Sequence, residues 1–316
     1  MRKGKSSSPA DKLESPVDHP ALVLVRGGGD LATGVALRLY RAGIKVVITE
    51  LAQPLAVRRT VSFGEAVYEG AHTVEGITAR LAKQDQVYAT LEANEIPVLI
   101  DPEANIILAS FFFVVVVDAR LLKMPPQPLP ADISLHIGLG PGFLAGVNCH
   151  AAIETRRSHT LGRVYWEGST QPDSGTPEGD PRRVLRAPVD GVLIPKAKIG
   201  EHVEQEQVVA AIRQQSAAAS EYTEHGVASP LKGVLRGLMR DGIQVTQGLK
   251  IGDVDPRDDP SACYLVSDKA LAMGGAALEA ILTRKEIREK IFYHPSTPLP
   301  RTALGLRRTG SGHKEL

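Results

Sequence analysis

The chain has 316 residues, and its 37 Lys and Arg side chains nearly balance 36 Asp and Glu side chains, for a net charge of +1. This length predicts two or three domains. The balanced charge and the 4% aromatic content argue against nucleic acid or a membrane as a partner. The only two cysteines, Cys149 and Cys263, lack C-x-x-C spacing, so neither a zinc site nor a disulfide framework is expected. The longest apolar run, residues 106–117, is too short to span a bilayer, and we expect a cytoplasmic protein without a bound metal.

A glycine-rich turn follows the first predicted strand. Residues 21–25 are apolar, Gly27, Gly28 and Gly29 follow, and residues 31–42 have helical periodicity. Gly27, Gly29 and Ala32 fit the G-x-G-x-x-G/A pattern, in which the chain turns tightly and a pyrophosphate approaches the helix N-terminus. A second predicted strand ends at Glu50, where a carboxylate can accept a hydrogen bond from a ribose hydroxyl. We therefore predict a nucleotide site at Gly27, Gly28, Gly29, Asp30 and Glu50, the alternative being a purely structural glycine turn.

Two arginines follow the second predicted strand. Arg58 and Arg59 are candidates to contact a phosphate, although solvent-exposed arginines are the commoner outcome.

Several later predicted strands also end in an acidic residue or a glycine loop. Residues 72–83 are predicted to be helical, and the apolar segments 96–100 and 111–117 are predicted strands that end at Asp101 and Asp118. A further strand, 133–137, leads into a second glycine loop with Gly140 and Gly142. Because parallel strands share one carboxyl edge, Asp101, Asp118, Gly140 and Gly142 are added to the predicted site; the alternative is that each acid caps the following helix.

Residues 148–159 carry the candidates for catalysis. On a predicted helix, His150 and Glu154 are four residues apart and share a face, so they can act as a general acid and base. The alternative is a structural hydrogen bond between them. A thiolate at Cys149 is a weaker candidate, because a lone buried cysteine is commonly inert.

An internal repeat with a shift of 42 residues follows a segment rich in Gly, Pro and Ser. The sequence PVDGVL at 188–193 matches PLKGVL at 230–235, and Gly200, Val203 and Gln205 match Gly242, Val245 and Gln247. Two such halves resemble the duplicated barrel of biotinyl and lipoyl domains. The joining segment, 214–224, contains no lysine, so a swinging-arm carrier is disfavoured. Asp253 and Asp255 are weighed as ligands of a hard cation, but a loop held by its own hydrogen bonds is favoured.

The predicted fold class is therefore α/β, with a Rossmann-like parallel sheet domain, a β-rich barrel-sandwich (biotinyl/lipoyl-like) module and a C-terminal helix. Near residues 269–284, Ala270, Gly274 and Ala277 form a small-residue face that permits close packing of this helix against the first domain. The predicted segments are a tail (1–19), the nucleotide-binding domain (20–166), a linker (167–183), the duplicated module (184–256), a helical segment (257–292) and a second tail (293–316).

The chain resembles the YqeB-type proteins of the selenium-dependent molybdenum hydroxylase system. The resemblance is carried, in order across residues 25–282, by RGGGDLATG, VVITE, VLIDPEA, VVVDARLLK, IGLGPGF, HAAIET, LGRV, GVLRGL, KIGDVDPR and SDKALAMGGAALEAI. It implies an accessory role in the maturation of molybdenum hydroxylases, with the hydroxylase or its maturation proteins as partners. Two segments depart from the pattern: Asn148-Cys149-His150 replaces Asp-Val-His, and Arg157-Ser158-His159 replaces Arg-Gly-His.

Three functions remain open on the sequence. The first is an accessory protein that binds a nucleotide-bearing ligand, either a dinucleotide form of the molybdenum cofactor or NAD(P), in a chain that can also form homo-oligomers. The second is an NAD-dependent oxidoreductase with His150 as the proton donor. The third is a non-catalytic docking scaffold.

Overall fold

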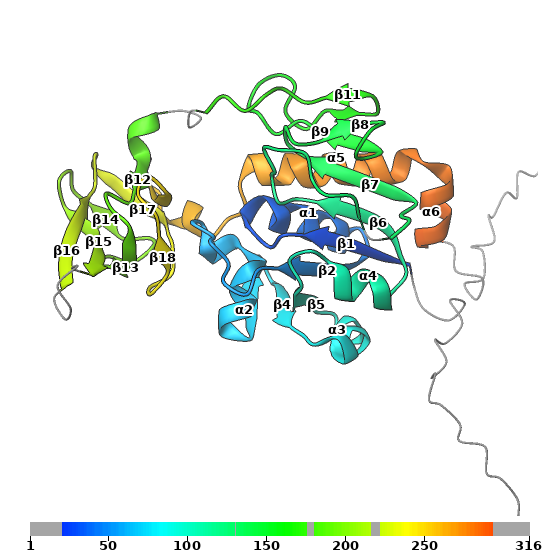
Figure 1. The fold of residues 1–316 in the computed structure, drawn as a ribbon, viewed down its shortest axis with the longest axis horizontal. Coiled ribbons are helices and arrows are strands. Elements are labelled where there is room, and N and C mark those ends of the chain that lie inside the picture. The colour runs from blue at the N-terminus through cyan, green and yellow to red at the C-terminus, as the bar shows by residue number, and fades with distance from the viewer. Residues whose placement is uncertain (1–20, 130, 176–179, 216–221, 293–316) are drawn as a thin grey trace, which may run out of the picture.

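The computed structural model describes residues 21–129, 131–175, 180–215 and 222–292; the predicted tails lie outside these residues, as do parts of the predicted linker and of the joining segment. Its larger part is built on a nine-stranded sheet with the order β10-β9-β7-β6-β1-β2-β5-β4-β3 (Figure 1). The strands from β9 to β4 run parallel to their neighbours, whereas β10 and β3 are antiparallel at the two edges. These strands are β1 (Leu22–Arg26), β2 (Lys45–Glu50), β3 (Ala71–Val74), β4 (Ile77–Leu81), β5 (Ile96–Ile100), β6 (Phe113–Asp118), β7 (Leu135–Leu139), β9 (Ala151–Ile153) and β10 (Val164–Tyr165).

Helices cover both faces of this sheet, which explains the continuous apolar sequences of β1 and β6. Helices α1 (Asp30–Arg41), α5 (Asp268–Thr283) and α6 (Lys285–Phe292) share one buried cluster with the sheet. Helices α3 (Val87–Glu92) and α4 (Asn105–Ser110) pack in a second cluster on the other face. The short helix α2 (Ala66–Glu69) lies near the edge strand β3, and β8 (Leu144–Ala145) pairs with β11 (Gly168–Ser169). Among the described residues, no helix has the length and apolarity that crossing a membrane requires.

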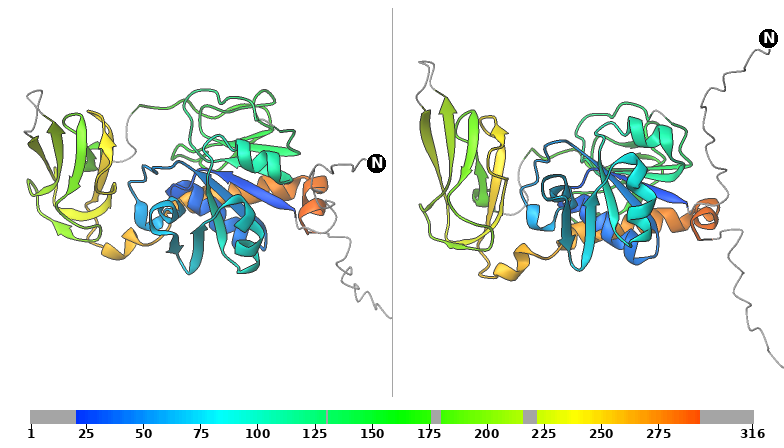
Figure 2. Two further views of the ribbon diagram at one scale, coloured as in Figure 1. Left: turned by 60° about the horizontal axis from the view of Figure 1, so that its bottom comes forward. Right: turned by 90° about the horizontal axis from the view of Figure 1, so that it is seen from below.

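The contact between α1 and α5 is unusually close. Gly34 on α1 lies against the backbone of Ala270, and Gly274 on α5 lies against the carbonyl oxygen of Gly34. Side chains at either glycine would collide with the opposite helix, so the small-residue face predicted for this helix is what lets it pack on the first domain. Helix α5 thereby completes the core above β7 and β9, although it comes late in the chain (Figure 2).

The second part of the chain consists of two four-stranded antiparallel sheets that share one apolar core. One sheet has the order β12-β19-β17-β14 and the other β16-β15-β13-β18. Each strand of the first half of the repeat corresponds to a strand 42 residues further on in the second half. The two corresponding strands lie in different sheets. The strands are β12 (Val184–Arg186), β13 (Gly191–Pro195), β14 (His202–Val203), β15 (Val208–Gln215), β16 (Tyr222–Ala228), β17 (Gly233–Leu238), β18 (Gln244–Val245) and β19 (Lys250–Asp255).

The segment that follows β2 joins the two parts. Arg59 Nε donates to the carbonyl oxygen of Leu238 at 3.1 Å, and Thr60 Oγ1 donates to that of Cys263 at 2.6 Å. From the other side, Arg240 pairs with the buried Glu65 at 2.7 Å and stacks on the ring of Tyr68. The antiparallel part therefore stands at one end of the large sheet, held by polar contacts (Figure 2).

The predicted fold class is wrong as a combination of a Rossmann-like parallel sheet and a barrel-sandwich module. The large sheet is mixed, because the antiparallel edge strands β3 and β10 flank its parallel strands. The repeat forms two separate antiparallel sheets in place of the predicted biotinyl/lipoyl-like barrel. The C-terminal helix is present, as two helices, α5 and α6.

Two local predictions are wrong for related reasons. Residues 72–83 form the hairpin β3–β4, because Glu75 and Gly76 adopt φ angles of 46° and 79° and turn the chain in two residues. Residues 151–153 form the buried strand β9 between β7 and β10, so His150 and Glu154 flank a strand. Both segments are predicted as helices because short apolar stretches fit either the helical or the strand periodicity.

Candidate functional site

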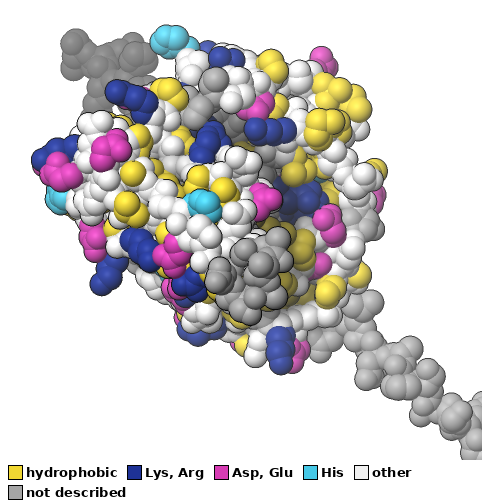
Figure 3. Space-filling view, turned by 60° about the vertical axis from the view of Figure 1, so that its left-hand side comes forward, with side chains coloured by type: hydrophobic (Ala, Val, Ile, Leu, Met, Phe, Trp, Pro, Cys, Tyr) yellow, Lys and Arg dark blue, Asp and Glu magenta, His cyan; other side chains and the backbone are white. Residues whose placement is uncertain are grey.

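A cavity of about 1370 Å³ lies between the carboxyl ends of the central strands and the antiparallel part. Residues after β1, β2, β5 and β6 form one wall, and residues of β17, β19 and the loop before α5 form the other. Nine Lys and Arg residues and five Asp and Glu residues line it. The cations are Arg58, Arg120, Arg156, Arg157, Arg183, Arg236, Lys250, Arg257 and Lys269. By contrast, the outer face seen in Figure 3 mixes Lys and Arg with Asp and Glu side chains. The cavity thus carries an excess of positive charge.

The glycine turn after β1 opens into this cavity. Gly29 is the N-cap of α1 and has no side chain to cap it, so the first N–H groups of the helix and its positive dipole end face the cavity. Gly28 has no room for a side chain, because a Cβ there would lie 2.8 Å from Gly64 N. At Gly29 a Cβ would meet nothing within 4 Å. The turn therefore presents backbone donors at a site with space in front of them.

Glu50 contributes to the shape of this turn. Its Oε2 accepts a hydrogen bond from Gly28 N at 2.6 Å, and its Oε1 accepts one from Leu51 N at 2.7 Å. The carboxylate lines the cavity, and its predicted contact with a ribose hydroxyl stays a prediction.

Asp118 positions a cation beside the glycine turn. It is fully buried at the end of β6, and Arg120 donates to its two oxygens at 3.0 and 2.8 Å. Arg26, at the end of β1, lies 3.3 Å from the same carboxylate. Burial lowers the pKa of the Arg26 guanidinium, and Asp118 opposes that shift. The Arg120 side chain lines the cavity next to the turn, since a Cβ at Gly27 would lie 3.5 Å from Arg120 Cγ, whereas Asp118 is not among the lining residues.

The remaining predicted binding residues act on the backbone. Asp101 accepts hydrogen bonds from Asn105 N at 3.1 Å and Ile107 N at 2.9 Å, and so caps α4. Gly140 has a φ of 99°, and a Cβ at Gly142 would lie 2.7 Å from Leu122 O. Neither glycine lines the cavity, although Pro141 between them does.

The structure does not bring His150 and Glu154 together. Four residues of extended chain separate their backbones by about 13 Å. The Nδ1 atom of His150 accepts a hydrogen bond from His136 N at 2.9 Å, while Glu154 accepts from Arg156 N and Gln171 N, both at 2.7 Å. Neither side chain lines the cavity.

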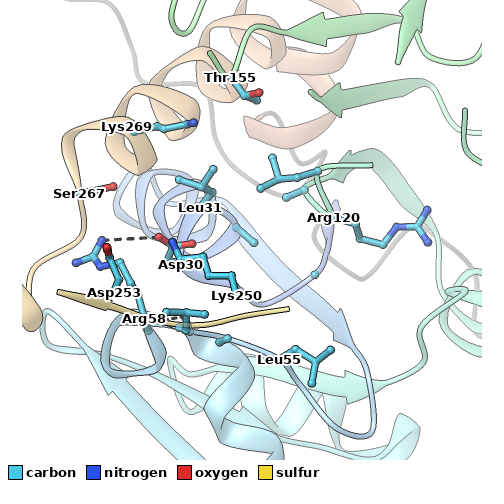
Figure 4. A pocket seen from close by; sticks show the side chains of 18 of the residues that line it. Asp30, Leu31, Leu55, Arg58, Arg120, Thr155, Lys250, Asp253, Ser267 and Lys269 are labelled. Atoms are coloured by element: carbon cyan, nitrogen blue, oxygen red, sulfur yellow. Dashed lines mark hydrogen bonds and ion pairs between the residues drawn. The ribbon is translucent and has the colours of Figure 1, made fainter. Parts of the chain in front are cut away.

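A group of cations faces the start of α1: Arg183, Arg236 and Lys250 come from the antiparallel part, and Arg58 comes from the segment that follows β2. We call these four residues the basic cluster. Arg58 is 8% exposed, donates to the carbonyl oxygens of Ala262 and Leu265, and lies 3.7 Å from Asp30. Arg236 pairs with the buried Asp253, and Arg183 Nε lies 3.6 Å from the other oxygen of Asp253. Figure 4 shows Arg58, Lys250 and Asp253 around Asp30. Burial lowers the pKa of both Arg58 and Lys250.

Asp253 and Asp255 both pair with arginines. Hydrogen bonds from Arg257 to Asp255 lower the pKa of that carboxyl to about 2. Within the described ranges, no group of three or more His, Cys, Asp or Glu residues is arranged to hold a metal ion.

Apart from Arg58, the residues of the basic cluster are not predicted as binding residues, yet the repeat contains a signal for them. Arg236 and Lys250 occupy the positions of Ile194 and Val208 in the first half, and Asp253 occupies that of Ala211. Because the first half builds the same strands with apolar residues at these positions, the charged residues of the second half are not needed for the fold. They therefore indicate a surface with a binding role.

The two cysteines lie outside the cavity lining and are buried. Burial raises the pKa of the Cys149 thiol to about 11 and raises that of Cys263 as well. At pH 8 the thiolate fraction of Cys149 is therefore on the order of 0.1%. We expect iodoacetamide to leave both thiols of the native protein unmodified over a period in which both react in urea, as intact mass measures. Rapid native labelling of Cys149 would contradict its buried position.

The fold and the cavity define a class: a two-part α/β protein in which a helix N-terminus and a basic cluster face one cationic cavity. No protein-family model matches the chain. The uncharacterized protein YqeB of Escherichia coli strain K12 is 42% identical over 286 residues, which cover 88% of this chain and 51% of that protein. The chain is a YqeB-type protein, as its motifs predict, and it spans about half the length of this relative.

Similarity to solved structures is weak. An aspartoacylase family protein from Mesorhizobium loti is 10% identical, with 75% of this chain and 85% of that chain covered and a TM-score of 0.24. A succinylglutamate desuccinylase/aspartoacylase from Rhodobacter sphaeroides is 14% identical, with 74% and 85% covered and a TM-score of 0.24. Likenesses at this level carry no argument, and the correction to the fold class rests on the sheet topology.

Proposed function

We propose that this chain binds a phosphate-bearing, nucleotide-like ligand in the cavity, as an accessory protein for the maturation of selenium-dependent molybdenum hydroxylases. The observation that carries the binding proposal is the uncapped N-terminus of α1, which opens into a cavity lined by nine cations. Unpaired N–H groups and the dipole of a helix favour an anion at this position. The volume of about 1370 Å³ suits a ligand as large as a dinucleotide.

The role in maturation comes from the resemblance of the motifs, and the YqeB relative is itself uncharacterized. Within this proposal the candidate ligands are a dinucleotide form of the molybdenum cofactor and NAD(P), and the cofactor would be cargo for a hydroxylase. No cysteine lines the cavity among the described residues, so the chain's own contribution is to hold phosphate and ribose groups. An NAD-dependent oxidoreductase is less well supported, because its proton donor, His150, lies outside the cavity lining.

The test is a thermal-shift titration with NAD, NADP, nucleoside mono- and diphosphates, and the molybdenum cofactor in mono- and dinucleotide forms. A ligand at 100 times its dissociation constant stabilises the protein by about 2.7 kcal/mol. Gly29→Asp is the diagnostic variant, because its side chain has space and a φ of −66° suits an N-cap residue. We expect the added carboxylate to raise the stability of the free protein by roughly 0.3–1 kcal/mol and to weaken the response to nucleotides, because it repels a phosphate at the N-terminus of α1.

Gly29→Asn is the matched control, since it adds an N-cap of the same size without charge. We expect this variant to retain more ligand binding than Gly29→Asp. If Gly29→Asp binds as tightly as the unaltered protein, the site is not at α1. A response to the molybdenum dinucleotide supports the maturation role, a response to NAD alone favours a dehydrogenase, and no response to any ligand leaves a docking scaffold.

A further inference from the structure

The basic cluster carries two positive charges in excess of the carboxylates around it. Arg58, Arg183, Arg236 and Lys250 are faced by the carboxylates of Asp30 and Asp253. Arg236 also lies 3.3 Å from Asp255, which pairs with Arg257, so the larger set of five cations and three carboxylates keeps the same excess of two positive charges. These side chains are largely removed from water, with 9% of Arg58, 13% of Arg236 and 24% of Arg183 exposed. Excess positive charge that is largely removed from water destabilises the protein unless a bound anion neutralises it.

Several polar atoms of this cluster make no hydrogen bond. Within the part of the chain that the structure describes, the buried Nε atoms of Arg58 and Arg236 make none, and Arg183 Nε faces only the equally unbonded Asp253 Oδ1, at 3.6 Å. Lys250 Nζ makes neither a hydrogen bond nor an ion pair with the described residues, although it lines the cavity. Buried donors in native proteins are nearly always satisfied, so the unbonded Lys250 ammonium at the cavity wall, beside these incompletely satisfied guanidinium groups, indicates a ligand.

The fold itself does not require these charges. The first half of the repeat builds the equivalent strand pair, β13 with β15, using Ile194, Val208 and Ala211 where the second half has Arg236, Lys250 and Asp253. Only the second half faces the start of α1. The charged replacements therefore coincide with the cavity wall.

We propose that the basic cluster is a second anion subsite, which takes a dianionic phosphate group through Lys250 and the neighbouring arginines. Resting on the proposed function, this subsite makes the ligand a molecule with two separated anionic groups, one at the N-terminus of α1 and one at the basic cluster. Because the two groups are bound by different parts of the chain, the ligand bridges the large sheet and the antiparallel sheets. Lys250 contributes a point charge, and the arginines contribute fixed donors.

Inorganic phosphate, at constant ionic strength, is the probe for this subsite, and Gly29→Asp is the background because it blocks the α1 site. We expect phosphate to stabilise Gly29→Asp against heat, and we expect the added substitution Lys250→Met to raise the phosphate dissociation constant roughly tenfold or more. Met keeps the apolar stem of the lysine, so the double variant folds. Without phosphate it is expected to melt at a higher temperature than its parent, since a half-buried unpaired cation has been removed.

Lys198→Met in the same background is the matched control, because Lys198 is exposed, lies on the antiparallel part and does not line the cavity. It is expected to leave the phosphate response unchanged. The inference is overturned if phosphate has no effect on Gly29→Asp, if Lys250→Met binds phosphate as its parent does, or if the two lysine variants lose binding equally.

The two proposals fail in different ways. If no nucleotide stabilises the unaltered protein but phosphate binding still depends on Lys250, the proposed function is wrong and the subsite stands. If nucleotide binding depends on Gly29 while Lys250→Met changes neither nucleotide nor phosphate binding, the proposed function stands and the subsite is wrong.

Discussion

Gly274→Ala is expected to lower the free energy of unfolding by about 2 kcal/mol, whereas Gly275→Ala, one residue further along α5, is expected to raise it by up to about 1 kcal/mol. A Cβ at Gly274 would collide with the carbonyl oxygen of Gly34 and lie 2.6 Å from Arg38 Cγ. A Cβ at Gly275 would meet nothing within 4 Å. Both substitutions replace glycine by alanine inside one helix, so they share the same gain in helix propensity and differ in packing alone.

Urea denaturation of the two variants measures the difference directly. The α1–α5 contact is not as close as described if both variants are stabilised alike. If both substitutions lower the free energy of unfolding, the backbone flexibility of glycine in α5 is needed for stability, and the packing difference is not the cause. Gly34→Ala tests the same contact from α1, because its Cβ would lie 2.6 Å from the carbonyl carbon of Ala270.

The second large effect concerns pH. His136, on the buried strand β7, is 7% exposed, and burial lowers its pKa to about 4. The unfolded chain binds a proton at this histidine below pH 6.5, while the folded protein does not until about pH 4, so this group lowers the stability as the pH falls through that window. The loss amounts to about 3 kcal/mol at pH 4 relative to pH 7.

His136→Leu removes this titration and also an unpaired buried nitrogen, Nε2. We expect the stability of the variant, measured by urea denaturation from pH 7 to pH 4, to fall by about 3 kcal/mol less than that of the unaltered protein. His202→Gln is the control, because 60% of the His202 side chain is exposed. Parallel stability curves for His136→Leu and the unaltered protein would show that folding does not lower the pKa of His136.

The sequence predicts the centre of the large sheet better than its edges. The central strands are long apolar runs followed by Gly or acidic residues, and these patterns are local. The edge strands are short: β9 has three residues and follows a loop, and β3 turns into β4 through Glu-Gly, which is a weaker hairpin signal than Asn-Gly. Fold class depended on those edges, so it was predicted wrongly.

The candidate site shows the same division. The glycine turn is contiguous in sequence, and it lies at the cavity with Asp30 and Glu50. The basic cluster is assembled from Arg58 and three residues between 183 and 250, and no spacing rule connects positions so far apart. Asp118, predicted to meet the ligand, is buried and accepts hydrogen bonds from Arg120. Whether the predicted binding residues contact a ligand stays a prediction.

The position of α5 has a consequence for the order in which the chain folds. On the ribosome, the strands of the large sheet emerge first, but the side of α1 that faces α5 stays uncovered until residues 268–283 have been made. The antiparallel part is synthesised in between, and most of its pairings join strands close in sequence, so they form rapidly, although β12 must wait for β19. We therefore expect the antiparallel part to be complete before α5 covers the large sheet. The nascent chain must hold an open apolar face for that interval, which makes this stage the one most exposed to aggregation.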